Sequence, residues 1–257
     1  MNKSGNINSV GRFLLLKRYV ASVLFHPIFE KLIGFVFNNR IPHRGSRILV
    51  PEGGGVNAAL FWGAYESAEI RFVRGFLDGS FDVVELGASL GGVSCEIARK
   101  IAKDRKLICI EANPQILGLL QKNLIINVPD KNFRVIHGAI NYDSNNQVNF
   151  AIGNNTLGSH LGSEGQVMVV PSITLSRILE SESICEFALV CDIEGAEVQI
   201  FKHDLRALSG CRILIIELHS VDYQGEKYNP DDLVYLIECS TSMRLVARYG
   251  SVCVFVR

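Results

Sequence analysis

The sequence lacks the features that mark several large classes of protein. Its 26 basic and 26 acidic residues cancel, so it has no cationic surplus of the kind that binding to nucleic-acid phosphates usually requires. No uninterrupted apolar run reaches the roughly 18 residues of a membrane-spanning helix. The seven cysteines include no C-x-x-C pair, and their odd number favours buried free thiols in a reducing cytosol over disulfides. We therefore expect a cytoplasmic protein with no nucleic-acid partner.

Two common nucleotide-binding patterns are also absent from the small-residue segment 87–92. A dinucleotide fingerprint, G-x-G-x-x-G, requires glycine where Ser89 stands, and a P-loop requires lysine where Val93 stands. What remains is an acidic residue, Glu85, followed by two glycines that are four residues apart. This arrangement suits the zwitterionic amino-acid tail of a ligand better than a pyrophosphate.

From about residue 61 onward, short apolar runs alternate with helical stretches, which is typical of a parallel sheet with crossover helices. The expected parallel strands cover 81–86, 107–111, 133–139, 187–193 and 211–218. An extra strand is expected at 148–152, and an antiparallel hairpin is expected at 244–249 and 252–256. The sequence thus predicts an α/β fold, a doubly wound and mostly parallel seven-stranded sheet, in one domain over residues 61–257.

Residues 1–60 are predicted to be an N-terminal helical extension and linker. Its apolar stretch, 13–37, is interrupted by charged residues such as Lys17, Arg18 and Glu30, which favours an amphipathic helix. Such a helix can pack on the core, make weak contact with a membrane surface or cap a partner. A second region, 153–172, is rich in Gly, Asn and Ser and is expected to be either a lid over an acceptor site or an ordinary surface loop.

Polar residues follow the expected strands, and ligands of such sheets bind beyond the carboxyl ends of the strands. Glu111 ends the second strand, where a carboxylate can accept both hydroxyls of a ribose. Ala139 follows the third strand and is expected to line an adenine face. Asp192 and Glu194 follow the fourth strand, at the place of the reacting centre. His219 follows the fifth strand and is a general-base candidate.

Six short motifs follow one another in order between residues 63 and 219. They are GAYE (63–66), ELGASLGG (85–92), IEANP (110–114), TLS (174–176), CDIEGAE (191–197) and ELH (217–219). This series resembles the FkbM family of methyltransferases, which has G-x-[YF]-E, D-x-G-A-N-x-G, E-P-N-P, T-L-D, K-I-D-x-E-G-A-E and E-x-H. The chain departs from that pattern with Glu85 for Asp, Ser89 for Asn, Ser176 for Asp and Cys191 for Lys.

The resemblance implies a Rossmann-like class I methyltransferase that uses S-adenosylmethionine to methylate a hydroxyl of a small molecule, sugar or glycoconjugate. The catalytic residues would be Asp192, Glu194 and His219. The cofactor-binding residues would be Glu66, Glu85, Gly87, Ala88, Ser89, Gly91, Glu111, Ala112, Asn113, Ala139 and Asp192. Direct displacement at the methyl group requires no metal, so none is predicted, although Asp192, Glu194 and His219 are competent ligands for a divalent ion.

Two other functions stay open at this point. A non-catalytic binding or scaffold protein can keep this fold, and the departures at Ser176 and Cys191 motivate that reading. A methyltransferase with a nucleic-acid or protein target is the second alternative. Against it, the sequence has neither the N/D-P-P-Y/F string of amino-group methylation nor a Pro-Cys nucleophile. The sequence makes no prediction of oligomeric state.

Overall fold

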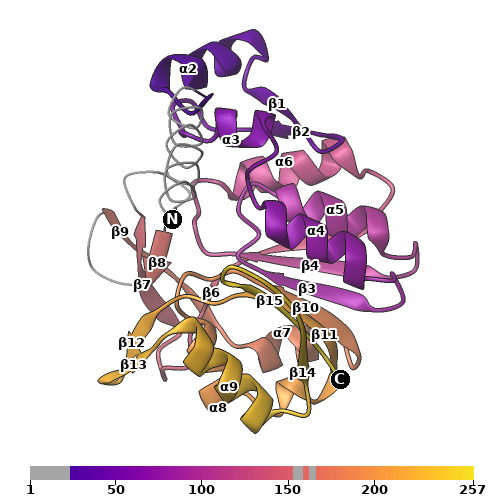
Figure 1. The fold of residues 1–257 in the computed structure, drawn as a ribbon, viewed down its shortest axis with the longest axis vertical. Coiled ribbons are helices and arrows are strands. Elements are labelled where there is room, and N and C mark those ends of the chain that lie inside the picture. The colour runs from indigo at the N-terminus through magenta and orange to yellow at the C-terminus, as the bar shows by residue number, and fades with distance from the viewer. Residues whose placement is uncertain (1–23, 153–158, 162–165) are drawn as a thin grey trace, which may run out of the picture.

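A seven-stranded sheet forms the centre of the molecule (Figure 1). The structure is a computed structural model, and it describes residues 24–152, 159–161 and 166–257. The sheet order is β14-β15-β11-β10-β3-β4-β5, in which the last five strands are parallel and the first two form an antiparallel hairpin. The strands are β3 (Asp82–Leu86), β4 (Lys106–Glu111), β5 (Asn132–His137), β10 (Phe187–Cys191), β11 (Cys211–Glu217), β14 (Arg244–Tyr249) and β15 (Val252–Val256).

The predicted sheet is therefore confirmed. The chain passes from β3 outward to β4 and β5, and then returns to add β10 and β11 on the other side of β3. The order reverses between β3 and β10, which is the switch point where sheets of this kind bind their ligands.

Helices cover both faces of the sheet because each central strand buries residues on both sides. Val83 and Val84 of β3 are neighbours in sequence, yet they belong to two different hydrophobic clusters, since successive strand residues point to opposite faces. One cluster contains residues of α4, α5 and α6, and the other contains residues of α7, α8 and α9. These helices are α4 (Ser67–Phe76), α5 (Gly92–Lys100), α6 (Leu117–Asn127), α7 (Leu175–Glu182), α8 (Glu197–His203) and α9 (Pro230–Ser240), with a short 3₁₀ turn at Ala207–Gly210.

A smaller, four-stranded sheet lies beside the central one and corrects the loop predicted at 153–172. Its order is β6-β9-β7-β8, and β9 pairs with β7 from Gln147↔Pro171 to Ile152↔Gln166. Phe150 and Val170 are buried between its strands and the body of the domain, which explains why this polar-looking segment forms a sheet. Its strands are β6 (Ala139–Ile140), β7 (Gln147–Ile152), β8 (Ser159–Leu161) and β9 (Gln166–Ile173). The rest of 153–165 lies outside the described residues.

The described part of the N-terminal region contains the predicted helix, and a hairpin forms in the part that was expected to be a linker. Between two helices, the chain forms an antiparallel hairpin whose turn, Arg44-Gly45, has positive φ at both residues, as a two-residue hairpin turn requires. Ile41 and Ile48 of this hairpin belong to the same buried cluster as the helices on that face of the sheet. The elements are α2 (Pro27–Val36), β1 (Arg40–His43), β2 (Ser46–Leu49) and α3 (Asn57–Phe61). The domain division at residue 60 stays a prediction.

A small hairpin follows β11, in which the strands β12 (Val221–Tyr223) and β13 (Glu226–Tyr228) pair. Among the residues that the structure describes, no helix has the length and apolar character needed to cross a bilayer.

Candidate active site

The loop after β3 brings the ends of three strands together. The backbone amides of Gly87 and Ala88 donate to the carbonyl of Ile110 at 2.9 and 3.0 Å, which ties the loop to β4. Gly87 has φ +84°, and a Cβ built there would lie 1.8 Å from the carbonyl oxygen of Asp192. Only glycine permits this approach, so Gly87 lets the carboxyl ends of β3, β4 and β10 meet.

Glu111 ends β4 with a buried carboxylate that accepts two short hydrogen bonds. Its Oε2 accepts from the amide of Ser89 and its Oε1 from the amide of Asn113, each at 2.7 Å. Burial raises the pKa of Glu111, and the backbone amides of Asn113 and Ser89 oppose that rise. Each carboxylate oxygen has two lone pairs, so the group keeps acceptor capacity for a ligand hydroxyl.

A pocket opens over these strand ends. It contains about 710 Å³ of empty space, part of which is open solvent. Three of its lining residues, Glu66, Ser89 and Glu194, have positive φ (47°, 50° and 53°) although they are not glycine. Such a backbone costs on the order of 1–3 kcal/mol per residue and concentrates at functional sites.

The pocket is electronegative. Glu66, Glu111, Asp192 and Glu194 line it, whereas the lining residues among those described include no Lys, Arg or His. Burial raises the pKa of Glu66 well above its ordinary value, and the charges of Glu85 and Asp192 add to the rise. A cationic ligand would relieve this repulsion and a phosphate would increase it. The pocket therefore favours a cation over a nucleotide phosphate.

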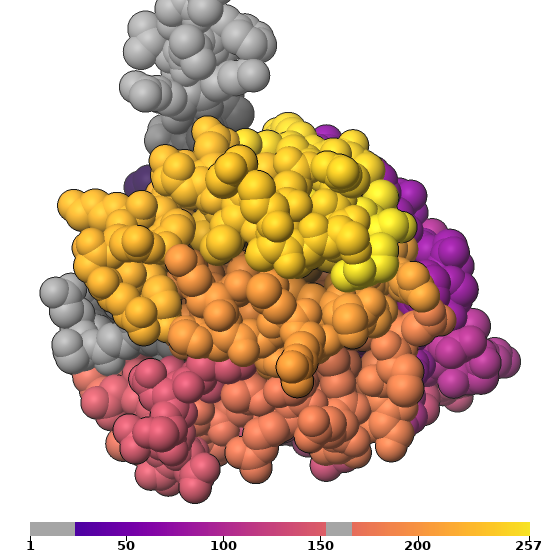
Figure 2. Space-filling view, turned by 90° about the horizontal axis from the view of Figure 1, so that it is seen from below, coloured from indigo at the N-terminus to yellow at the C-terminus, as the bar shows by residue number. Residues whose placement is uncertain are grey.

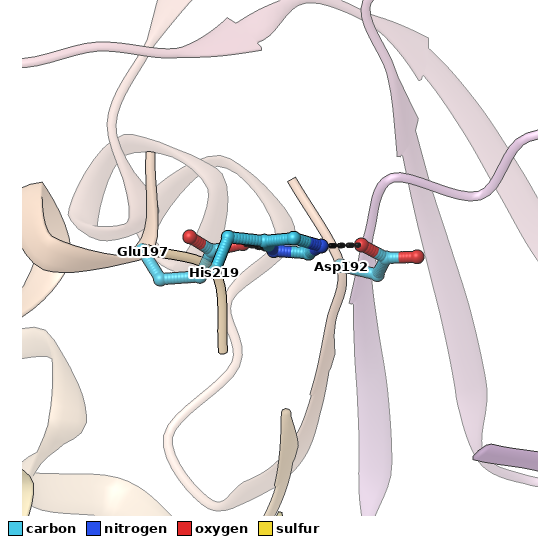
Figure 3. Close-up of side chains that lie close together, drawn as sticks. All are labelled: Asp192, Glu197 and His219. Atoms are coloured by element: carbon cyan, nitrogen blue, oxygen red, sulfur yellow. Dashed lines mark hydrogen bonds and ion pairs between the residues drawn. The ribbon is translucent and has the colours of Figure 1, made fainter. Parts of the chain in front are cut away.

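His219 lies beside the pocket, between the carboxylates of Glu197 and Asp192 (Figure 3). Its Nδ1 donates to Oε1 of Glu197 at 3.0 Å, and the Glu197 side chain is fully buried. Its Nε2 lies 3.8 Å from Oδ1 of Asp192 and 3.4 Å from Oε2 of Glu194. Glu197 begins α8, directly after the D-x-E-G-A segment, so this short helix places the carboxylate that orients the imidazole.

The protonation of this group follows from its surroundings. Burial lowers the pKa of His219, but the hydrogen bond and charge of Glu197, with the charges of Asp192 and Glu194, more than offset burial and raise the pKa to about 9. Burial raises the pKa of Asp192 well above its ordinary value, the charge of Glu217 adds to this, and His219 opposes it. These surroundings thus favour the protonated form of His219, which faces Asp192.

The same residues have the donor chemistry of a metal site. One ligand atom from each of Asp192, Glu197 and His219 lies within 4.8 Å of the others. However, Nδ1 of His219 and Oε1 of Glu197 are already matched as donor and acceptor at 3.0 Å, without an ion between them. That no metal takes part stays a prediction.

The structure brings most of the predicted site residues to one pocket. Three predicted cofactor residues, Glu85, Ala88 and Gly91, do not line it: Glu85 is buried within β3, where its Oε2 accepts from the thiol of Cys109. His219 is outside the wall and contacts it through Asp192 and Glu194. The predicted residues in the wall are Glu66, Gly87, Ser89, Glu111, Ala112, Asn113, Ala139, Asp192 and Glu194.

Several residues of the site were missed by the sequence analysis. Tyr65 lines the pocket, and its hydroxyl lies 2.9 Å from Oγ of Ser89. Ile116 and Phe150 supply apolar walls from α6's first turn and from β7. Tyr65 and Glu197 stand inside the quoted GAYE and CDIEGAE motifs, so each motif was a signal for them, whereas nothing in the sequence pointed to Phe150.

The raised pKa of His219 predicts how stability depends on pH. The proton that His219 binds more tightly in the folded state stabilises the fold fully below pH 6.5, and this contribution is lost as the pH rises toward 9. It is worth about 3 kcal/mol at most. We expect the free energy of unfolding, measured with urea at pH 6.5 and 9, to fall more steeply for the wild-type protein than for His219→Gln. Equal falls in the two proteins would show that His219 is not held as an imidazolium.

Comparison with known proteins places this site in a family. The family described as "Methyltransferase FkbM domain" matches residues 85–243, which is more than half of the chain and includes the glycine loop, Glu111, Asp192 and His219. The chain belongs to this family. Its fold is that of the class I methyltransferases, and its methyl donor is S-adenosylmethionine. A search of curated proteins found no significant match.

Solved structures of similar fold include several methyltransferases. The precorrin-6y C5,15-methyltransferase of Geobacter metallireducens GS-15 is 12% identical, with 76% of this chain and 86% of that chain covered and a TM-score of 0.41. Aeropyrum pernix fibrillarin with natively bound S-adenosyl-L-methionine is 10% identical, with 70% and 68% covered and a TM-score of 0.41. The bifunctional kinase-methyltransferase WbdD is 14% identical, with a TM-score of 0.46. The alignment covers 86% of this chain but only 44% of WbdD. Likeness at these levels carries no argument about the acceptor.

The residues of the pocket fit the family's cofactor. S-adenosylmethionine carries a sulfonium and an ammonium, and the carboxylates of the wall match such a cation. The carboxylate of Glu111 lines the pocket and would accept from the ribose hydroxyls. Ala139 and Phe150 provide an apolar wall for a base on the β5 side of the sheet.

Proposed function

We propose that the protein is an O-methyltransferase that acts on a hydroxyl of a small molecule, a sugar or a glycoconjugate. The observation that supports this most strongly is the state of Asp192. The residue lines the pocket at the end of β10, and its Oδ1, which lies 3.8 Å from Nε2 of His219, accepts no hydrogen bond. An acceptor hydroxyl is the kind of donor that such an oxygen lacks.

The proposed reaction is a direct displacement. Bound S-adenosylmethionine supplies an electrophilic methyl carbon; the new O–C bond forms as the C–S bond breaks and its electron pair goes to sulfur. The protein has to align the hydroxyl and accept its proton. We assign the proton to Asp192, whose raised pKa makes it a stronger base than an ordinary aspartate.

His219 has a different proposed role from the one that the sequence favoured. The imidazole is outside the pocket wall and its surroundings favour the protonated form, so it is poorly suited to accept a further proton. We infer that it is a positioning residue: Glu197 holds the ring, and the ring holds the carboxylates of Asp192 and Glu194. Glu194 would complete the negative wall at the acceptor side of the pocket.

An acceptor screen tests this function. Purified protein with isotopically labelled S-adenosylmethionine is incubated with sugars, glycoconjugates and small alcohols, and with transfer RNA and a protein extract as controls. We expect label only on oxygen of a hydroxyl-bearing small acceptor, located by mass spectrometry. Label on RNA or protein would contradict the proposal. Tight cofactor binding with no turnover on any acceptor would instead support a non-catalytic binding protein.

A further inference from the structure

The charge of this chain is distributed unevenly, although its total is zero. The first 51 residues contain eight of the 26 basic residues and one of the 26 acidic residues, Glu30. This segment therefore has a net charge of +7, and the rest of the chain has a net charge of −7. Asymmetry of this size between parts of a chain is typical of proteins that bind an anionic surface.

The single acidic residue of this segment does not offset the positive charge at the surface. Glu30 turns inward, where Oε1 accepts from the amide of Asn57 at 2.5 Å and Oε2 from the amide of Ala58 at 2.8 Å. Its carboxylate thereby caps the amino end of α3. Lys31, Arg40 and the other basic residues described in this region are exposed.

Helix α2 also leaves an apolar face uncovered. Ile28, Leu32, Phe35 and Val36 have exposed fractions of 67%, 50%, 85% and 62%. Their spacing of i, i+4, i+7 and i+8 places them on one side of the helix. The opposite side packs inward through Ile33. Figure 1 shows α2 at one end of the molecule, beyond α3 and the β1–β2 hairpin.

We propose that α2 and its basic neighbours form a docking surface for an anionic lipid membrane. Aliphatic and aromatic side chains gain free energy by entering the boundary between headgroups and acyl chains, while flanking Lys and Arg bind anionic headgroups. Nucleic acid would match the charge but would leave the apolar face in water. A second copy would match the apolar face but would bring two segments of +7 together. The lipid surface satisfies both features.

The amino acids before α2 have the same composition. Residues 13–25 are mainly apolar and contain Lys17 and Arg18 but no acidic residue. The docking surface does not depend on the acceptor chemistry proposed above, because α2 contributes no residue to the pocket wall. It is linked to that wall through α3, which packs against α2 and is followed by Tyr65 and Glu66.

Vesicle flotation of the full-length protein tests this proposal. The vesicles are phosphatidylcholine alone or an equimolar mixture with phosphatidylglycerol. We expect binding to the mixed vesicles that weakens as salt is added, and little binding to phosphatidylcholine. The double variant Phe35→Ser/Val36→Ser should lower the partition coefficient at least about tenfold, and Lys31→Gln and Arg40→Gln should each lower it about fivefold.

A matched control distinguishes binding through this surface from nonspecific adsorption to vesicles. Tyr235 on α9 is 72% exposed, and α9 lies at the end of the molecule opposite α2 (Figure 1). In the view from below, the C-terminal part of the chain covers that face (Figure 2). Tyr235→Ser should therefore bind vesicles like the wild-type protein. All these side chains are exposed, so thermal melts of the variants should match.

Three results would overturn the proposal. One is the absence of binding to either kind of vesicle, and another is equal binding to both kinds at all salt concentrations. The third is a dimer, detected by light scattering without lipid, that Phe35→Ser/Val36→Ser dissociates. That dimer would show that the apolar face of α2 docks a second copy.

Discussion

Asp192→Asn should lower kcat by about a thousandfold while cofactor affinity stays within about twofold of the wild-type value. The amide is nearly the same size as the carboxylate, and the backbone amide of Asp192 would still donate to the carbonyl of Leu86 at 2.9 Å. The architecture of the strand ends is thus preserved. What the variant loses is an oxygen that can accept the proton of the acceptor hydroxyl. Turnover is measured by methyl transfer, and affinity by calorimetric titration with S-adenosylhomocysteine.

The control for this variant is Asp222→Asn, which makes the same chemical change at an exposed position on β12. It should leave both kcat and affinity unchanged. His219→Gln provides a graded comparison: a positioning residue should reduce kcat less than the base does and should alter the pH profile of kcat. Full activity of Asp192→Asn would remove Asp192 from the mechanism. Loss of cofactor binding would show that its carboxylate serves the donor and not the acceptor.

Glu111→Ala should weaken S-adenosylhomocysteine binding by at least about a hundredfold. Two ribose hydroxyls would lose a charged acceptor, and a hydrogen bond to a charged group contributes about 1.5–3 kcal/mol. The loss also frees the amides of Ser89 and Asn113, each of which now donates to Glu111 at 2.7 Å. Calorimetric titration of wild-type and variant protein measures the change, with ATP and NAD as ligands that should bind neither. Their phosphates would face a wall that has carboxylates and, among the described lining residues, no cationic side chain.

Two further variants make this result interpretable. Glu180→Ala removes an exposed carboxylate from α7 and should bind like the wild-type protein. Glu111→Gln keeps the shape and one acceptor oxygen, and should show an intermediate affinity. Its melting temperature should be lower than that of the wild-type protein, because the new NH2 group faces a backbone amide that now donates to a carboxylate oxygen. If Glu111→Ala binds S-adenosylhomocysteine normally, the ribose is held elsewhere. If the wild-type protein also fails to bind, the pocket is not competent without an acceptor.

The central sheet was predictable because its strands carry strong local signals. Runs such as 107–110 and 187–191 are apolar without interruption, as strands buried on both faces must be. The hairpin at 244–256 was predictable for a different reason, since Gly250-Ser251 is a two-residue turn between two strands. The strands that the sequence did not predict include β1, β2 and β9. These strands are short or exposed in part, so their pairing depends on partners that local sequence does not name.

Order along the strands also made much of the site predictable. Glu111 ends one buried strand and Asp192 directly follows another. Parallel strands of one sheet end at the same edge, so the convergence of these two residues followed from the sequence. The position of the Glu85 side chain did not follow from the sequence. Glu85 precedes the glycine loop by two residues, but alternation along β3 turns its side chain into the sheet and away from the pocket.

By itself, the sequence determined the fold class, the family and the acidic strand ends, because each depends on residues close together in the chain and on their order. Only the tertiary structure decided which residues contact one another at those strand ends. Tyr65 contacts Ser89, which is 24 positions later in the chain, and Glu197 holds His219, which is 22 positions later. Phe150 adds an apolar wall from a second sheet. The protonation of His219 was decided there as well, because a pKa depends on burial and on charges that only folding brings within 4 Å.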